Sequence, residues 1–141
     1  MIKRFLLLVL IFSLTMLIIG CVPSSRPDLI VQSLGDPDVD CSLAAAPGFC
    51  ATTVTFTIAN IGAADAGPFK VLVRADPGLA QQGTVSVSGL AAGATTTLTI
   101  TLPPSGNCYD PDCDICITVD SDSEVIESNE GNNDLCELTI G

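Results

Sequence analysis

Carboxylates and cysteines are the side chains of this chain whose types and spacing could support chemistry. Carboxylates alternate with other residues in three segments: Asp36-x-Asp38-x-Asp40, Asp110-x-Asp112-x-Asp114 and Asp120-x-Asp122-x-Glu124. Ca²⁺ prefers hard oxygen ligands, and alternate residues of a loop can surround such an ion. Two more carboxylates follow the third segment, so the sequence indicates a candidate Ca²⁺ site made of Asp120, Asp122, Glu124, Glu127 and Glu130.

A solvated acidic hairpin is the alternative interpretation of this third segment, and the one that the sequence favours. Asn129, Asn132 and Asn133 accompany the carboxylates, and asparagine side chains in loops bind nearby backbone groups in Asx-turns. None of the three segments is an EF-hand loop, because the glycine and the final glutamate of that loop are missing. We therefore expect no cofactor, with Ca²⁺ as the one candidate ion.

Six cysteines follow Cys21 in the sequence: Cys41, Cys50, Cys108, Cys113, Cys116 and Cys136. An even number of cysteines in an exported chain predicts disulfides, and six cysteines allow fifteen connectivities. We expect the pairs Cys41–Cys50, Cys108–Cys113 and Cys116–Cys136. The first two pairs would each close one loop, and the third would join the last two strands.

The cysteine spacing also allows a metal–thiolate site as an alternative to disulfides. The spacing Cys108-x₄-Cys113-x₂-Cys116, with Cys136 later, is similar to the cluster motif of plant-type ferredoxins. The same four residues could bind zinc. Export argues against both metals, because disulfides form outside the cytosol and clusters are not usually inserted there.

Catalysis is not expected, because the chain contains no histidine. This absence excludes Ser-His-Asp and Cys-His machinery as well as metals bound by histidine. Paired carboxylates could in principle hydrolyse glycosides, so a small envelope hydrolase remains an alternative. The sequence identifies no catalytic residue.

The N-terminal segment has the pattern of a signal peptide. Lys3 and Arg4 precede an apolar run from Phe5 to Ile19, which as a helix would span only ~22 Å of the ~30 Å hydrocarbon core. Gly20-Cys21 resembles the lipobox of bacterial lipoproteins. The resemblance implies cleavage of residues 1–20 and acylation of Cys21, which would anchor the protein to the extracytoplasmic face of the cell membrane, in the periplasm or at the cell surface. An uncleaved anchor that buries the Cys21 thiol is the alternative.

The chain after residue 20 is strongly acidic and long enough for one domain. Its cations are Arg26, Lys70 and Arg74, set against sixteen carboxylates, which gives a formal charge of about −13. Such a surface repels phosphate backbones, so we expect no nucleic-acid partner. The expected partners are the membrane, through lipid on Cys21, and an envelope protein or glycan. Residues 21–26 form a short tether, and residues 27–141 form the domain.

The elements that must position these side chains are short β-strands. Gly, Pro, Asp and Asn separate seven runs rich in β-branched residues, and no helical period is present. Several runs alternate apolar and polar residues, as in Val54, Phe56 and Ile58 against the threonines between them. The expected strands are Leu29–Leu34, Thr53–Ala59, Phe69–Arg74, Thr84–Ser88, Thr96–Leu102, Ile115–Val119 and Leu135–Ile140. This pattern predicts an all-β fold, a seven-stranded immunoglobulin-like β-sandwich stapled by disulfides, with a small closed barrel as the alternative.

Several short motifs add a family resemblance. Pro27-Asp28-Leu29 opens the first run, Asn60-x-Gly62 closes the second, and Val119-Asp120, Val125-x-Glu127 and Asn129-Glu130-Gly131-Asn132-Asn133 precede the last. In this order they resemble the CARDB domain, a bacterial and archaeal immunoglobulin-like module named for cell adhesion, over roughly residues 26–140. The resemblance implies a β-sandwich without a common ligand or common catalytic residues. The leading hypothesis is a non-catalytic binding or scaffold module; a Ca²⁺-dependent adhesion or interaction module using residues 120–134 is the second.

Overall fold

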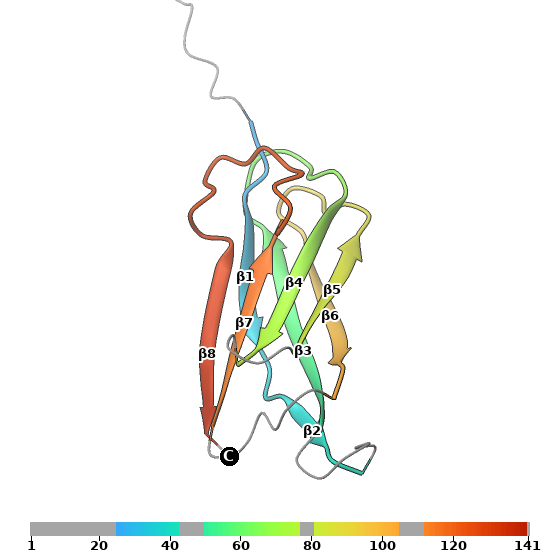
Figure 1. The fold of residues 1–141 in the computed structure, drawn as a ribbon. Coiled ribbons are helices and arrows are strands. Elements are labelled where there is room, and N and C mark those ends of the chain that lie inside the picture. Colours follow the sequence, from blue (N-terminus) through green and yellow to red (C-terminus); the bar gives the residue numbers. More distant parts are fainter. Residues whose placement is uncertain (1–24, 43–49, 77–80, 105–111, 141) are drawn as a thin grey trace, which may run out of the picture.

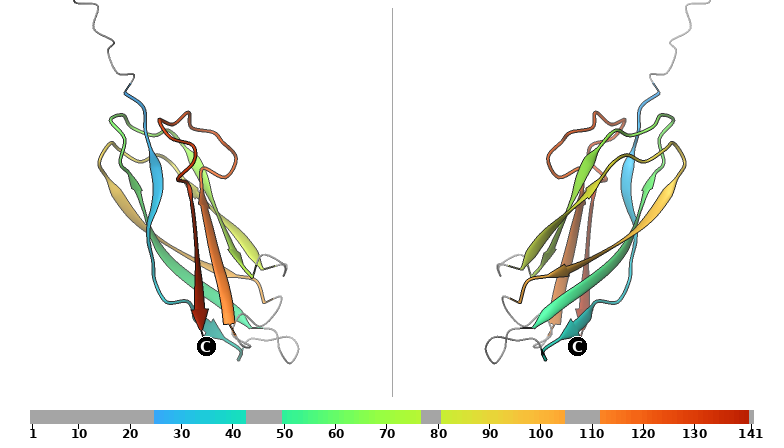
Figure 2. Two further views of the ribbon diagram at one scale, coloured as in Figure 1. Left: turned by 90° about the vertical axis from the view of Figure 1, so that its left-hand side faces the viewer. Right: turned by 90° about the vertical axis from the view of Figure 1, so that its right-hand side faces the viewer.

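The structure, a computed structural model, describes residues 25–42, 50–76, 81–104 and 112–140. Residues 1–20 and Cys21, which carry the signal-peptide and lipidation predictions, lie outside the described residues. Two sheets face each other as the layers of a sandwich (Figures 1 and 2). All pairs of neighbouring strands are antiparallel. The predicted all-β sandwich is therefore confirmed.

Each sheet contains four strands. The first consists of β1 (Leu29–Leu34), β2 (Asp38–Asp40), β3 (Ala51–Asn60) and β6 (Thr95–Leu102), with β3 in the centre. The second has the order β5 (Gln82–Val87), β4 (Phe69–Ala75), β7 (Asp112–Val119) and β8 (Asp134–Ile140). Each predicted run corresponds to one of these strands. The additional strand is β2, which pairs with the start of β3 in a segment that the sequence predicted to be a loop.

The core lies between the two sheets and follows from the alternation in the sequence. The inward side chains of β3, β4 and β7 are almost completely buried: Val54, Phe56, Ile58, Phe69, Val71, Val73, Ile115, Ile117 and Val119. Burial of such side chains contributes about 1.5–3 kcal/mol each, relative to leaving them exposed. Their polar neighbours along each strand point outward, as expected for half-buried antiparallel strands.

Threonine side chains cover the outer face of β3 and β6. Their hydroxyl oxygens pair across the two strands, with 2.9 Å between Thr53 and Thr101, 3.0 Å between Thr55 and Thr99, and 3.1 Å between Thr57 and Thr97. Each pair also occupies directly opposite positions in the strand register. Cross-strand threonine pairs of this kind stabilise a sheet by roughly 0.2–1 kcal/mol each.

Disulfides join neighbouring strands in both sheets. Cys41–Cys50 closes the β2–β3 connection, and Cys116–Cys136 joins directly opposite residues of β7 and β8. These are two of the three pairs expected from the sequence. Cys113 is also disulfide-bonded, while Cys108 lies outside the described residues.

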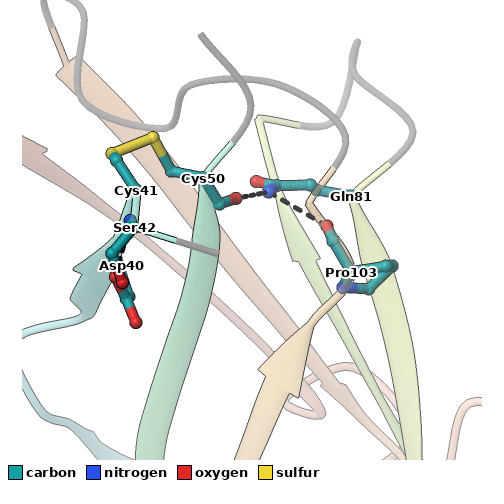
Figure 3. The surroundings of a disulfide bond; sticks show 6 residues. All are labelled: Asp40, Cys41, Ser42, Cys50, Gln81 and Pro103. Atoms are coloured by element: carbon teal, nitrogen blue, oxygen red, sulfur yellow. Dashed lines mark hydrogen bonds between the residues drawn. A yellow bond between two sulfur atoms is a disulfide. The ribbon is translucent and has the colours of Figure 1, made fainter. Parts of the chain in front are cut away.

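A buried glutamine connects the sheets beside the first disulfide. The Nε2 of Gln81 donates hydrogen bonds to the carbonyl oxygens of Cys50, at 2.8 Å, and Pro103, at 3.1 Å (Figure 3). Gln81 directly precedes β5, whereas Cys50 and Pro103 flank β3 and β6 of the other sheet. The glutamine therefore satisfies two backbone acceptors where the sheets meet.

Asn60 organises the opposite end of the sandwich, where β1 begins (Figure 1). Its Oδ1 accepts hydrogen bonds from the backbone N–H of Asp28 and of Gly62, both at 3.1 Å. Its Nδ2 donates to the carbonyl oxygens of Ala64, at 2.8 Å, and Leu90, at 2.9 Å. All four hydrogen-bonding positions of this buried amide are thus satisfied.

The glycine two residues later is required by close packing. A Cβ on Gly62 would lie 2.4 Å from the carbonyl oxygen of Arg26 and 2.5 Å from the backbone nitrogen of Asp28. The backbone of residues 26–28 leaves no room for a side chain at this position. The Asn60-x-Gly62 motif therefore fixes the start of β1 against the β3–β4 turn.

We expect Asn60→Ala to lower the free energy of unfolding by about 3–5 kcal/mol, because it leaves two donors and two acceptors without their partner. Urea denaturation measures this loss. Asn129→Ala is the matched control, since exposed Asn129 accepts only the hydrogen bond from the Gly131 N–H at 3.1 Å. The control should cost less than about 1 kcal/mol. Equal losses in the two variants would contradict the role assigned to Asn60.

Candidate functional site

The candidate site lies in the acidic loop between β7 and β8, which we call loop 120–133. This loop occupies the end of the sandwich at which β1 begins (Figures 1 and 2). Asp120 opens the loop with a positive φ of 50°. Its Oδ1 accepts the N–H of Glu124 at 2.9 Å, and its Oδ2 accepts the N–H of Val125 at 3.0 Å. Both carboxylate oxygens of Asp120 therefore hold the fold of the loop.

Glu127 connects the loop to the first strand. One carboxylate oxygen, Oε2, accepts a short hydrogen bond from the Leu29 N–H, and Oε1 accepts one from Asn133 Nδ2 at 2.6 Å. The side chain is only 3% exposed. Burial raises the pKa of Glu127 above its ordinary value, the two hydrogen bonds oppose this rise, and the neighbouring carboxylates of Glu130 and Asp120 add to it.

Glu130 completes a cluster of three carboxylates. Its Oε1 accepts the Glu127 N–H at 2.8 Å. One carboxylate oxygen each from Asp120, Glu127 and Glu130 lie within 4.8 Å of one another. Buried Asn133 adjoins this cluster, and its Oδ1 has no hydrogen-bond partner among the described residues. The arrangement offers clustered hard oxygens, the ligand type that Ca²⁺ prefers.

The other two candidate ligands of the loop lie outside this cluster. Asp122 forms an ion pair with Lys70 of β4, which raises the pKa of the Lys70 ammonium together with the charge of Glu124. Glu124 lines an open hollow of about 380 Å³ with Lys70, Ser86, Val87 and other residues in or next to β4 and β5. Of the five predicted ligands, the structure therefore brings three together.

The other two acidic segments and the cysteines lie on other parts of the chain than loop 120–133. Asp36, Asp38 and Asp40 are exposed on and beside β2, and Asp112 and Asp114 are exposed on β7. Asp110 lies outside the described residues. Cys113, Cys116 and Cys136 are disulfide-bonded, so their thiolates do not form the iron–sulfur or zinc site considered as an alternative.

Asp28 is a residue of this site to which the sequence assigned no role. Its Oδ1 accepts a hydrogen bond from Asn132 Nδ2 at 2.8 Å, and its Oδ2 accepts one from Ser128 Oγ at 3.1 Å. The backbone N–H of Ser128 also donates to the carbonyl oxygen of Pro27 at 2.9 Å. The only sequence signal for these contacts was the Pro27-Asp28-Leu29 motif itself.

A sequence profile of a known family matches residues 26–137, which include β1, the Asn60 turn and loop 120–133. The chain belongs to the CARDB family. No curated protein matches the chain. The CARDB motifs noted in the sequence coincide with the contacts that join β1 to the loop, so the resemblance has a structural basis.

Two solved structures of similar domains support the CARDB assignment. A crystal structure of the CARDB domain of the PF1109 protein from Pyrococcus furiosus, in complex with di-metal ions, has 25% sequence identity and a TM-score of 0.58, covering 82% of this chain and 94% of that one. A solution structure of a domain from a candidate cell surface protein of Methanosarcina acetivorans has 26% identity and a TM-score of 0.58, covering 82% and 91%. Within the described parts of this CARDB chain, no helix has the length and apolar character needed to span a membrane.

The raised pKa of Glu127 makes a prediction about the pH dependence of stability. The folded state keeps the proton to a higher pH than the unfolded chain, so the stability contributed by Glu127 is largest at low pH and declines as pH rises through the folded pKa. Glu127→Gln removes this titration. Urea denaturation from about pH 4 to about pH 7 measures the change, and wild-type stability relative to Glu127→Gln should be lower at the upper end of this range than at the lower end.

Glu137→Gln is the matched control for this experiment, because Glu137 is exposed on β8. Its stability difference from the wild type should stay nearly flat over the same range. A wild-type advantage over Glu127→Gln that grows with pH would show that the hydrogen bonds outweigh burial, contrary to the prediction.

Proposed function

We propose that this protein is a lipid-anchored, non-catalytic binding or scaffold module on the extracytoplasmic face of the cell membrane. The observation that supports it best is that the polar side chains of the CARDB motifs are used for structural hydrogen bonds. Asp28, Asn60 and Glu127 all serve to hold the start of β1. The Methanosarcina relative, described as a candidate cell surface protein, supports the extracytoplasmic location.

The proposed anchor determines which end of the domain faces the membrane. From Cys21 to Pro27 the chain can extend at most ~20 Å. Pro27 lies at the end that carries loop 120–133 and the Asn60 turn. This end would therefore lie close to the lipid, and the opposite end, with β2, would point away from it.

Two exposed apolar side chains at the anchored end fit this orientation. Ile61 is 58% exposed and Ile126 is 72% exposed, and each is adjacent to residues that contact the segment 26–29. Arg26 lies beside them and donates a hydrogen bond to the carbonyl oxygen of Glu127 at 3.5 Å. Apolar side chains next to a cation are suited to contact the membrane interface. The threonine face of β3 and β6 and the distal end remain accessible to an envelope protein or glycan.

Single tryptophan reporters test this orientation, since the chain contains no tryptophan. The tryptophan fluorescence of the Ile61→Trp and Ile126→Trp variants should be quenched by brominated lipid when the membrane-extracted protein is reconstituted in vesicles. Leu138→Trp is the matched control, because Leu138 is 57% exposed and belongs to the second half of β8, a strand that runs away from this end of the sandwich (Figure 1). Its emission should be unaffected by the brominated lipid.

Mass spectrometry of the same sample separates the two parts of the proposal. A chain that begins at lipidated Cys21 is expected. An unmodified Cys21, or a mature N-terminus elsewhere, contradicts the lipoprotein assignment. Lipidated protein whose tryptophan is quenched only at position 138 contradicts the orientation.

A Ca²⁺-dependent interaction module is the second candidate function. The carboxylates of Asp120, Glu127 and Glu130 lie close together beside the unpartnered Asn133 Oδ1, and the Pyrococcus relative was solved with di-metal ions. An ion there would relieve the repulsion among three clustered charges. The carboxylates already accept hydrogen bonds, yet each oxygen has further lone pairs that could bind a cation.

If this site exists, millimolar Ca²⁺ should raise the melting temperature more than Mg²⁺, which demands octahedral geometry and keeps its waters. Glu130→Gln should abolish that difference while keeping the acceptor for the Glu127 N–H. Asp38→Asn, an exposed carboxylate on β2, is the matched control and should preserve the difference. Equal small shifts with both ions would indicate charge screening and would contradict a specific site.

A further inference from the structure

The disulfide between β7 and β8 lies on the outer face of the second sheet. Ile115 and Ile117 point into the core, so Cys116 between them faces outward, and Cys136 lies directly opposite. Cys136 belongs to the edge strand β8 and is exposed, whereas Cys116 is only 6% exposed. One end of the disulfide is therefore accessible from solvent and the other is shielded.

A cationic residue lies directly opposite the shielded cysteine. Arg74 of β4 is directly opposite Cys116 in the strand register and faces outward, since Val73 and Ala75 are buried in the core. Its Nε is buried without a hydrogen-bond partner, and Arg74 takes part in no ion pair among the described residues. The guanidinium charge is thus available to a neighbouring anion.

Carboxylates on the same face would destabilise a thiolate at Cys116, but they lie farther from the cysteines than the directly opposite Arg74 position does. Asp114 and Asp134 each lie two residues along their strand from a cysteine of the pair. Asp134 accepts a hydrogen bond from Thr118 Oγ1 at 2.5 Å. Directly opposite side chains lie roughly 5 Å apart at Cβ, whereas positions two residues along a strand are separated by about 6.7 Å.

We propose that Cys116–Cys136 is a thiol-exchange site, at which an external thiolate forms a mixed disulfide with Cys136. The thiolate attacks Cys136 Sγ, a new S–S bond forms there, and the Cys116–Cys136 bond breaks. The electron pair passes to Cys116 Sγ, which leaves as a thiolate beside Arg74. A cation next to a cysteine lowers its thiol pKa and makes it a better leaving group. Oxidation state is conserved, because one disulfide replaces another.

The other described disulfide also joins an exposed cysteine, Cys41, to a shielded one, but no cation lies opposite either residue in the register of β2 and β3. Cys50 is only 2% exposed, and its sulfur would leave without a neighbouring cation to stabilise the thiolate. Opening Cys116–Cys136 also leaves the backbone pairing of β7 with β8, from Asp112 to Thr118, in place. The site can therefore react while the sandwich stays folded, and this inference does not depend on the proposed membrane anchor.

Native protein incubated with reduced glutathione near pH 7.5, then acid-quenched and alkylated, tests the proposal by peptide mapping. The glutathione adduct should appear on Cys136 with an alkylated Cys116, at least about tenfold faster than any adduct on Cys41, Cys50 or Cys113. Adducts that form first on another cysteine, or only after urea unfolding, would overturn the proposal.

Variants of Arg74 test its contribution to leaving-group stabilisation. Arg74→Gln should slow adduct formation on Cys136 about three- to tenfold, and Arg74→Lys, which keeps the charge, should retain most of the wild-type rate. Melting curves of both variants establish that each is folded. Equal rates of adduct formation in the glutamine and lysine variants would show that the Arg74 charge does not stabilise the leaving thiolate. In both folded variants the first adduct should still form on Cys136, and an adduct that forms first on another cysteine would overturn the proposal.

Discussion

The structure depends on how the first residues of β1 are held between the two sheets. Consecutive backbone donors, the N–H groups of Asp28 and Leu29, bind acceptors from opposite sides: Asn60 at the end of β3 and Glu127 in loop 120–133. β1 is an edge strand of the first sheet, so Glu127 gives it a contact with the connection between the last two strands of the second. Buried donors without a partner would cost roughly 1–3 kcal/mol each. The loop and the strand therefore order one another.

This requirement explains why an acidic loop persists in a chain that already carries excess negative charge. Asp120 and Glu127 act first as hydrogen-bond acceptors, in a region where the backbone presents several N–H groups without strand partners. Burial of the Glu127 carboxylate next to Asp120 and Glu130 destabilises its charged form, and this destabilisation raises the pKa of Glu127. A cation at the cluster would stabilise the charged carboxylates. The same three side chains can therefore hold the fold of the loop and bind an ion.

Much of the fold could be predicted from the sequence, because the alternation of apolar and polar residues is local information. β1 was predicted with its observed bounds, and the inward residues of β3, β4 and β7 follow directly from their spacing. β2 was missed since three residues are too few to show a period, and its pairing depends on β3 farther along the chain. The partners of the candidate ligands were unpredictable for the same reason: Asp122 binds Lys70, and Glu127 binds Leu29, both distant in sequence. Alternation within the loop therefore could not separate the clustered carboxylates from those that point elsewhere.

The end of the sandwich at which β1 begins and the outer face of the second sheet have different chemical surroundings, which suit two kinds of contact. At the end where β1 begins, Asp28, Asn60 and Glu127 are engaged in hydrogen bonds, and Ile61 and Ile126 are exposed apolar side chains, which suits contact with a surface. On the outer face of β4, β7 and β8, Arg74 lies opposite Cys116 of the cross-strand disulfide in the register, and it has no anionic partner among the described residues. Reaction at that disulfide would leave Asn60, Glu127 and the core untouched, because the sulfurs lie on the opposite side of the sheet from the buried residues of β7. A covalent contact at this face and a non-covalent contact at the end of the sandwich can therefore exist in one small domain without competing for the same residues.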